Sequence, residues 1–147
     1  MNECTIAVRV NWPGEGDVRQ PILSFVSDSN GITLLCSNDL IDTMEVSVDD
    51  DSGLETVVIS TSGPLETGWQ QVAVVFKADA LELYLNGELV GSAIPMSLPI
   101  ELGETTENWL GMSIDPLDNL FQGALDDVRI YNRALSQVEI AELHGLD

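Results

Sequence analysis

The sequence predicts an all-β fold, an antiparallel sandwich of two sheets with one short helix near its C-terminal end. Short segments in which apolar and polar residues alternate recur along its 147 residues, and this period of two is typical of strands. Turn sequences rich in Gly, Pro, Asn and Asp separate these segments at close spacing. Only residues from Ser136 to Leu143 suit a helix, so a sandwich is favoured over a parallel α/β sheet.

The expected strands share β-branched or alternating apolar residues and end at turn sequences. In chain order they are 6–12, 22–26, 32–36, 44–48, 56–60, 69–76, 81–85, 89–90, 109–114 and 124–131. The clearest hairpin is at Asn86-Gly87, because both central positions of a type I′ turn need positive φ. A helix is expected from Ser136 to Leu143, with Ser136 as N-cap and Glu139 completing a capping box.

The composition predicts one acidic domain over residues 1–147. There are 25 Asp and Glu residues against 5 Lys and Arg, a formal net charge of −20. Such a charge repels phosphate backbones and anionic lipids, so neither nucleic acid nor a membrane is an expected partner. Cys4 and Cys36 form no metal-type pair, and the opening MNECTIAVRV lacks the features of a secretory signal. Reduced thiols are therefore expected, and the localisation stays open.

Three segments carry a resemblance to a known family. Residues 68–76 (GWQQVAVVF), 83–90 (LYLNGELV) and 121–136 (FQGALDDVRIYNRALS) follow one another in the family's order. They resemble the W-x-x-V-A strand, the L-Y-V-N-G-x-x-V hairpin and the closing F-x-G-x-I-D-D-V-R-I-Y-N-R-A-L-S segment of laminin G-like domains. This resemblance implies a concanavalin A-like jelly roll of the lectin/glucanase type, with Trp69 in its core. It also implies a non-enzymatic binding module, and relatives of this type are often extracellular.

The chain departs from the family pattern near its start. In family members, the strand that corresponds to Thr5 to Asn11 usually carries a Trp, and Arg9 stands at that position here. Members also usually have several strands before that one. Without those strands, a sheet edge or an apolar face would be left uncovered, and each invites pairing with a second copy. We therefore expect a homodimer. A rearranged compact sandwich is the alternative.

Two tryptophans are candidates for a sugar-binding platform, because an aromatic face packs well on the apolar C–H groups of sugars. Trp12 ends a strand beside a loop, and Trp109 starts one after a polar run. Core packing is the alternative for each of them.

Asp126 and Asp127 are candidate calcium ligands, because the resemblance implies that the Asp of the G-x-I-D segment contributes to a calcium site in many relatives. Calcium takes six to eight oxygen ligands from carboxylates and loop carbonyls. The alternative is that Asp126 accepts hydrogen bonds from the backbone and that Asp127 faces solvent. Calcium is therefore a possible cofactor.

No catalytic residues are expected. Glycosidases of this fold carry a Glu-x-Asp-x-x-Glu pattern, whose alternation points both glutamates into the cleft. Here Glu15-Gly16-Asp17 lacks the second Glu, and the lone His144 has no expected Ser or Cys partner. The predicted function is the binding of a carbohydrate or a protein surface. The alternatives are a structural domain that acts through a homodimer interface and, least favoured, a degenerate glycoside hydrolase.

Overall fold

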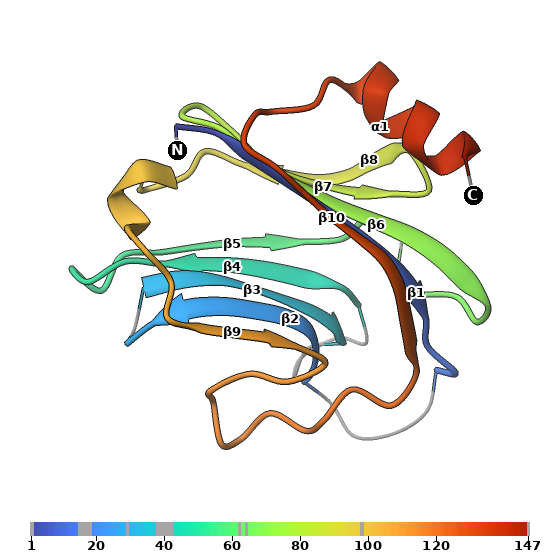
Figure 1. Ribbon diagram of the computed structural model, residues 1–147, viewed down its shortest axis with the longest axis horizontal. Coiled ribbons are helices and arrows are strands. Elements are labelled where there is room, and N and C mark those ends of the chain that lie inside the picture. The colour runs from blue at the N-terminus through green and yellow to red at the C-terminus, as the bar shows by residue number, and fades with distance from the viewer. Residues whose placement is uncertain are drawn as a thin grey trace.

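The computed structural model consists of two antiparallel sheets stacked face to face (Figure 1). It describes residues 2–14, 19–28, 30–37, 43–61, 63, 65–97 and 99–146. Sheet A has the strand order β10 (Ala124–Tyr131), β1 (Cys4–Asn11), β6 (Trp69–Phe76), β7 (Leu81–Leu85) and β8 (Glu88–Ala93). Sheet B has the order β5 (Glu55–Ile59), β4 (Glu45–Asp49), β3 (Asn30–Ser37), β2 (Gln20–Ser27) and β9 (Glu107–Leu110). The all-β antiparallel sandwich is thus confirmed.

The core lies between the two sheets and is filled by the inward-facing residues of each strand. Alternation along β1 turns Ile6, Val8 and Val10 inward, because successive side chains of a strand point to opposite faces. From sheet B, Leu34 and Val46 meet them as register partners on β3 and β4. The apolar area removed from water here is what holds the two sheets together.

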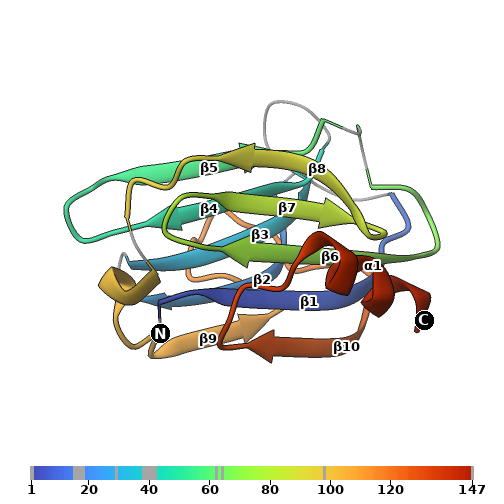
Figure 2. The same cartoon turned by 90° about the horizontal axis from the view of Figure 1, so that it is seen from above.

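Helix α1 (Gln137–Gly145) covers the outer face of sheet A, on the side away from sheet B (Figures 1 and 2). Its buried Ile140 and Leu143 belong to a second apolar cluster with Ala73 and Tyr84 of sheet A. Ser136 is the N-cap, and its capping box with Glu139 is present as predicted. The middle of sheet A is therefore buried on both faces, whereas helix α1 leaves the outer face of sheet B uncovered.

Most expected strands are confirmed, and the hairpin at Asn86 (φ 50°) and Gly87 (φ 84°) has the positive φ values that its type requires. The strand expected over 109–114 is wrong from Gly111 onward, because β9 (Glu107–Leu110) ends at Leu110 and Gly111 turns the chain with φ 71°. A short 3-10 helix, η1 (Pro99–Leu102), lies where a loop was expected. Nowhere in the described ranges is a helix long and apolar enough to cross a membrane.

The strands β9 and β10 form the outer edges of their sheets on the same side of the sandwich (Figure 2). The pairing of β10 with β1 is interrupted by a register shift between Ala7 and Arg9, and Asp127 lies there with φ 50°. A bulge of this kind bends an edge strand and makes it a poor template for pairing with another strand.

Candidate functional site

A polar hollow of about 510 Å³ lies on the outer face of sheet B. Its floor comes from the outward-facing residues of β2, β3, β4 and β5, and one wall comes from the loop that follows β9. The described residues that line it are Arg19, Ser24, Val26, Asp28, Thr33, Glu45, Ser47, Asp49, Glu55, Ser113, Ile114, Asp115, Pro116 and Asp118.

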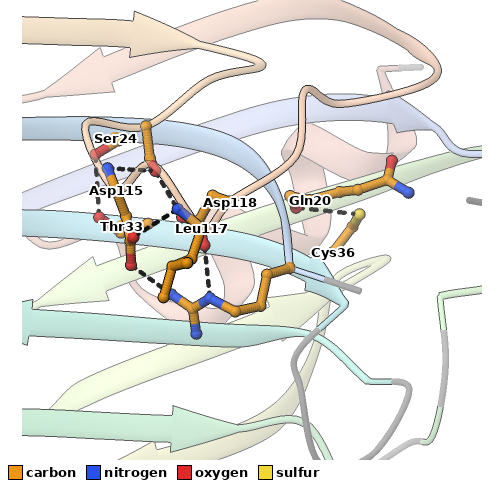
Figure 3. A network of polar contacts seen from close by, with 9 residues as sticks. Gln20, Ser24, Thr33, Cys36, Asp115, Leu117 and Asp118 are labelled. Atoms are coloured by element: carbon orange, nitrogen blue, oxygen red, sulfur yellow. Dashed lines mark hydrogen bonds and ion pairs between the residues drawn. The ribbon is translucent and has the colours of Figure 1, made fainter. Parts of the chain in front are cut away.

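A row of hydroxyl groups crosses the floor of the hollow. Ser24, Thr33 and Ser47 are register partners on β2, β3 and β4, so their side chains share one face. Ser24 Oγ and Thr33 Oγ1 are 3.1 Å apart and hydrogen-bonded (Figure 3). Each hydroxyl has one donor and two acceptor sites. Thr33 and Ser47 are half-buried and can offer hydrogen bonds to a polar ligand, whereas Ser24 is fully buried and supports Thr33 from below.

The far end of the floor is acidic. Asp49 on β4 lies directly opposite Glu55 on β5, and Glu45 lies on the same face of β4. Burial, followed by the negative charges of Glu55, Asp50 and Glu45, raises the pKa of Asp49 from 3.8 to about 6. This end of the hollow thus concentrates negative charge at neutral pH.

The loop wall is fastened to sheet B by an ion pair. Arg19 Nε is 2.5 Å from Asp118 Oδ1, and Arg19 Nη2 is 3.7 Å from Asp115 Oδ2. Ser113 Oγ donates to Asp118 Oδ2 at 2.6 Å, and the Leu117 N–H donates to Asp115 Oδ1 at 2.9 Å. Figure 3 shows Asp115, Leu117 and Asp118 gathered beside Ser24 and Thr33. The guanidinium in this wall is therefore neutralised by its own neighbours.

Trp109 lies on the outer face of β9, where its register partner is Ser24 of the hydroxyl row. Its side chain is 39% exposed. The candidate platform residue thus stands beside the polar hollow, on the same face of sheet B.

Trp12 lies in the core and not on the outer face of sheet B, so the prediction of an exposed platform at this residue is wrong. Its side chain is 2% exposed and belongs to the core, because the even positions from Ile6 onward face inward. Its indole Nε1–H donates to Gln20 Oε1 at 3.2 Å. A buried acceptor thus satisfies the polar end of the ring, which is the usual condition for burying Trp.

Gln20 was missed by the sequence reasoning, although it is fully buried. Besides Trp12, its Oε1 accepts the N–H of Gln122 at 2.9 Å. Its carbonyl accepts the thiol of Cys36 at 3.3 Å (Figure 3). No sequence pattern marks such a residue. Cys36 and Cys4 are thiols that form no disulfide, and burial raises the pKa of the Cys4 thiol to about 11.

Trp69, which the resemblance placed in the core, is 44% exposed. It starts β6 opposite Asn11 on the outer face of sheet A, beyond the residues that helix α1 covers. The guanidinium carbon of Arg9 lies 5.0 Å from the ring centroid, a cation–π contact. Trp69 therefore lies on the outer face of sheet A, on the opposite side of the sandwich from the hollow.

The two candidate calcium ligands have partners of their own. Asp126 Oδ1 accepts the N–H of Asp127 at 2.8 Å. Both carboxylate oxygens of Asp127 bind Arg129, at 2.8 and 2.6 Å. Within the part of the chain that the structure describes, no group of three or more His, Cys, Asp or Glu side chains is arranged to hold a metal. Calcium binding stays a prediction. The Glu15-Gly16-Asp17 segment lies outside the described residues.

A second, apolar hollow of about 470 Å³ opens between the sheets. It lies on the side where β9 and β10 form the edges, and Ile130 at its rim is 57% exposed. Its lining includes Cys4, Ile6, Phe25, Ile32, Phe76, Pro99, Leu102, Gly103, Thr105, Asn108 and Ile130. It offers an apolar surface but few polar groups to orient a ligand.

Solved structures with the same fold include two with a bound oligosaccharide and one described as a binding domain. A Ruminococcus gnavus IT-sialidase CBM40 bound to α2,3-sialyllactose is 15% identical, with a TM-score of 0.81 over 99% of this chain and 84% of that chain. Domain 4 of AbnA, a GH43 extracellular arabinanase from Geobacillus stearothermophilus, in complex with arabinotriose, is 18% identical, with a TM-score of 0.80 over 97% and 66%. The botulinum neurotoxin serotype G binding domain is 14% identical, with a TM-score of 0.72 over 99% and 36%.

A family model covers nearly the whole sequence. Residues 1–141 match the model described as the concanavalin A-like lectin/glucanases superfamily. A search of curated protein sequences found no match. The jelly-roll prediction is confirmed by this match together with the two-sheet architecture. The chain therefore belongs to the concanavalin A-like lectin/glucanase superfamily.

Proposed function

We propose that this chain is a non-catalytic carbohydrate-binding module whose ligand lies on the outer face of sheet B. The observation that carries the proposal is the position of Trp109, which is 39% exposed beside a polar hollow of about 510 Å³. The sugar ring would pack on the indole while its hydroxyl groups reach those of Thr33 and Ser47.

The chemistry of this face suits a sugar. Oligosaccharides present apolar C–H faces and many hydroxyl groups, so their sites combine an aromatic ring with paired donors and acceptors. Trp109 supplies the ring, and the half-buried Thr33 and Ser47 supply hydroxyl groups. The hollow has the size of a small-ligand site. Two of the solved structures with the same fold hold sialyllactose and arabinotriose, which supports the carbohydrate over a protein ligand.

The test is a glycan array followed by titration calorimetry on the glycans that bind. We expect Trp109→Ala to weaken binding about fivefold or more, taking the about 1–3 kcal/mol that stacking of a nucleic-acid base on an aromatic side chain contributes as the guide. Trp69→Ala is the matched control, since that ring is exposed to a similar degree on the opposite sheet. Full binding by Trp109→Ala, or an array on which no glycan binds, would contradict the proposal.

Glycoside hydrolysis is a second candidate, favoured by the facing pair Asp49 and Glu55. Two nearby carboxylates, one with a raised pKa, are what glycosidases use, and the pKa of Asp49 is raised to about 6. However, Glu55 is exposed, and across the described ranges neither carboxylate accepts a hydrogen bond that would orient it. His144 is also exposed, near the end of α1. Binding therefore ranks first.

A reducing-end assay separates these two functions. The glycans that bind are incubated with the protein at pH 5 to 7, and the products are quantified. We expect the protein to release no more reducing ends than Asp49→Asn, the matched variant that lacks the carboxyl group with the raised pKa. Turnover that is lost in Asp49→Asn would establish the hydrolase instead.

A further inference from the structure

The hollow on sheet B is strongly acidic. Among the described residues that line it are six carboxylates and one guanidinium, a formal charge of −5: Asp28, Glu45, Asp49, Glu55, Asp115, Asp118 and Arg19. The whole chain adds to this field with its net charge of −20. A hollow lined by one sign of charge focuses the potential and alters which ligands reach it.

The single guanidinium cannot offset this charge for a ligand. Arg19 is engaged by Asp118 at 2.5 Å and by Asp115 at 3.7 Å. An anionic ligand that recruited Arg19 would have to separate it from Asp118, whose side chain is 2% exposed. That would leave a buried carboxylate without its partner, which is costly.

Among the described residues that line the hollow, Arg19 is the only Lys or Arg. The chain has five Lys and Arg residues, and the remaining four lie elsewhere: Arg9 contacts Trp69, Lys77 pairs with Glu82, Arg129 with Asp127, and Arg133 with Glu139. Asp49 and Glu55 therefore face one another across β4 and β5 without a basic residue between them. Their mutual repulsion contributes to the raised pKa of Asp49.

We infer that this face binds uncharged glycans and rejects glycans that carry carboxylates, such as sialosides and uronates. The inference rests on the proposed function and gives the ligand class of the same site. A carboxylate placed in the hollow would lie within one Debye length, roughly 8–10 Å, of several like charges. The similarity to a fold that holds sialyllactose therefore does not extend to the charge of the ligand.

The experiment uses matched pairs of glycans on one array, in which each neutral core is printed with and without a sialic acid or a uronate. Lactose with α2,3-sialyllactose is one such pair, and arabinotriose with and without a uronate is another. At low salt we expect each acidic member to bind at least tenfold more weakly than its neutral partner. This ratio should shrink as salt is raised, because screening weakens the repulsion. Acidic members that bind as tightly as the neutral ones would overturn the inference and leave the proposed function standing, whereas silence toward every glycan would overturn both.

A pair of variants assigns the discrimination to the hollow. Asp49→Asn with Glu55→Gln removes two charges from the acidic end, and we expect the ratio of neutral to acidic affinity to fall several-fold. Asp79→Asn with Glu88→Gln is the matched control, because it removes the same charge from exposed positions of sheet A, in the turn between β6 and β7 and at the start of β8. Equal ratios for the two double variants would show that the net charge of the chain, not the hollow, selects the ligand, and would overturn the inference. Circular dichroism checks that both variants fold.

Discussion

Arg19 and Asp118 are joined across 99 residues of sequence by an ion pair in which Nε lies 2.5 Å from Oδ1. Their side chains are 26% and 2% exposed, so solvent and salt screen the pair only in part. Arg19 lies directly before β2 and Asp118 lies in the loop after β9. The ion pair therefore holds that loop against sheet B and gives the hollow its wall.

Asp118→Asn should lower the free energy of unfolding by about 1.5–3 kcal/mol, the range of a hydrogen bond to a charged group. It should also weaken glycan binding, because the wall of the hollow is released. Asp115→Asn is the control, since this more exposed carboxylate lies 3.7 Å from Arg19 and should cost under about 1 kcal/mol. Urea unfolding measures both, and equal losses would argue against a dominant Asp118 pair.

Asp49 should make the folded protein less stable above pH 6 than below it. Its pKa is about 6 in the folded protein against a usual value of 3.8, so the folded state binds the proton more tightly than the unfolded state. The ionised carboxylate therefore destabilises the fold above pH 6, and this loss is relieved as the pH falls through 6 toward 4.

Asp49→Asn should accordingly be more stable than the wild type at pH 7.5, by under about 1 kcal/mol because the group is partly solvated. The difference should close by pH 4. Glu88→Gln controls for the general loss of negative charge, since Glu88 is exposed on β8. Melting curves from pH 4 to 7.5 give the result, and an advantage that does not change with pH would refute this reading of Asp49.

Gln20→Leu should cost about 2–4 kcal/mol, because it leaves the indole N–H of Trp12 and the backbone N–H of Gln122 buried without their acceptor. Gln122→Leu should be nearly neutral, since that side chain is exposed and only its backbone takes part. Thermal unfolding of the two variants compares them. A stable Gln20→Leu protein would mean that water replaces the missing acceptor.

Calcium binding at Asp126 and Asp127 predicts a thermal shift. Any ion would have to share Asp127 with Arg129, so we expect a weak site. Calcium at ten times its Kd raises the free energy of unfolding by about 1.4 kcal/mol. Melting in calcium and in chelator, with Asp126→Asn as the negative control, tests this. No shift at 10 mM calcium would rule the site out at any useful affinity.

The expected homodimer has a definite candidate surface, the apolar hollow with Ile130 at its rim. Ile130→Lys should shift sedimentation toward the monomer, because it places a charge on apolar surface that a partner would cover. Val138→Lys is the control, an exposed apolar residue on helix α1. Since each copy carries a charge of −20, association should be stronger at high salt. A monomer at high concentration and high salt would dismiss the dimer.

Most of the fold could be predicted because period-two alternation, turn sequences and the capping box are local features. The sequence could not tell Trp12 from Trp69, since both flank strands. Their exposure depends on which face helix α1 covers and on the buried acceptor Gln20, which is eight residues from Trp12 in sequence. The acidic pair of Asp49 and Glu55 was also missed, because it comes from the register of two strands. The exposure of Trp109 could be predicted, because a polar run before it favours an exposed ring, and its role in binding stays a prediction.

Helix α1 packs on the outer surface of one sheet and the polar hollow opens on the outer surface of the other. A group attached through the helix would thus lie on the sheet A side, and the face of sheet B that we propose to bind glycans would point away from it. For a biosensor, coupling near Leu146 should leave the ligand side open to the flow, whereas coupling through Glu107 or Asp28 should block it.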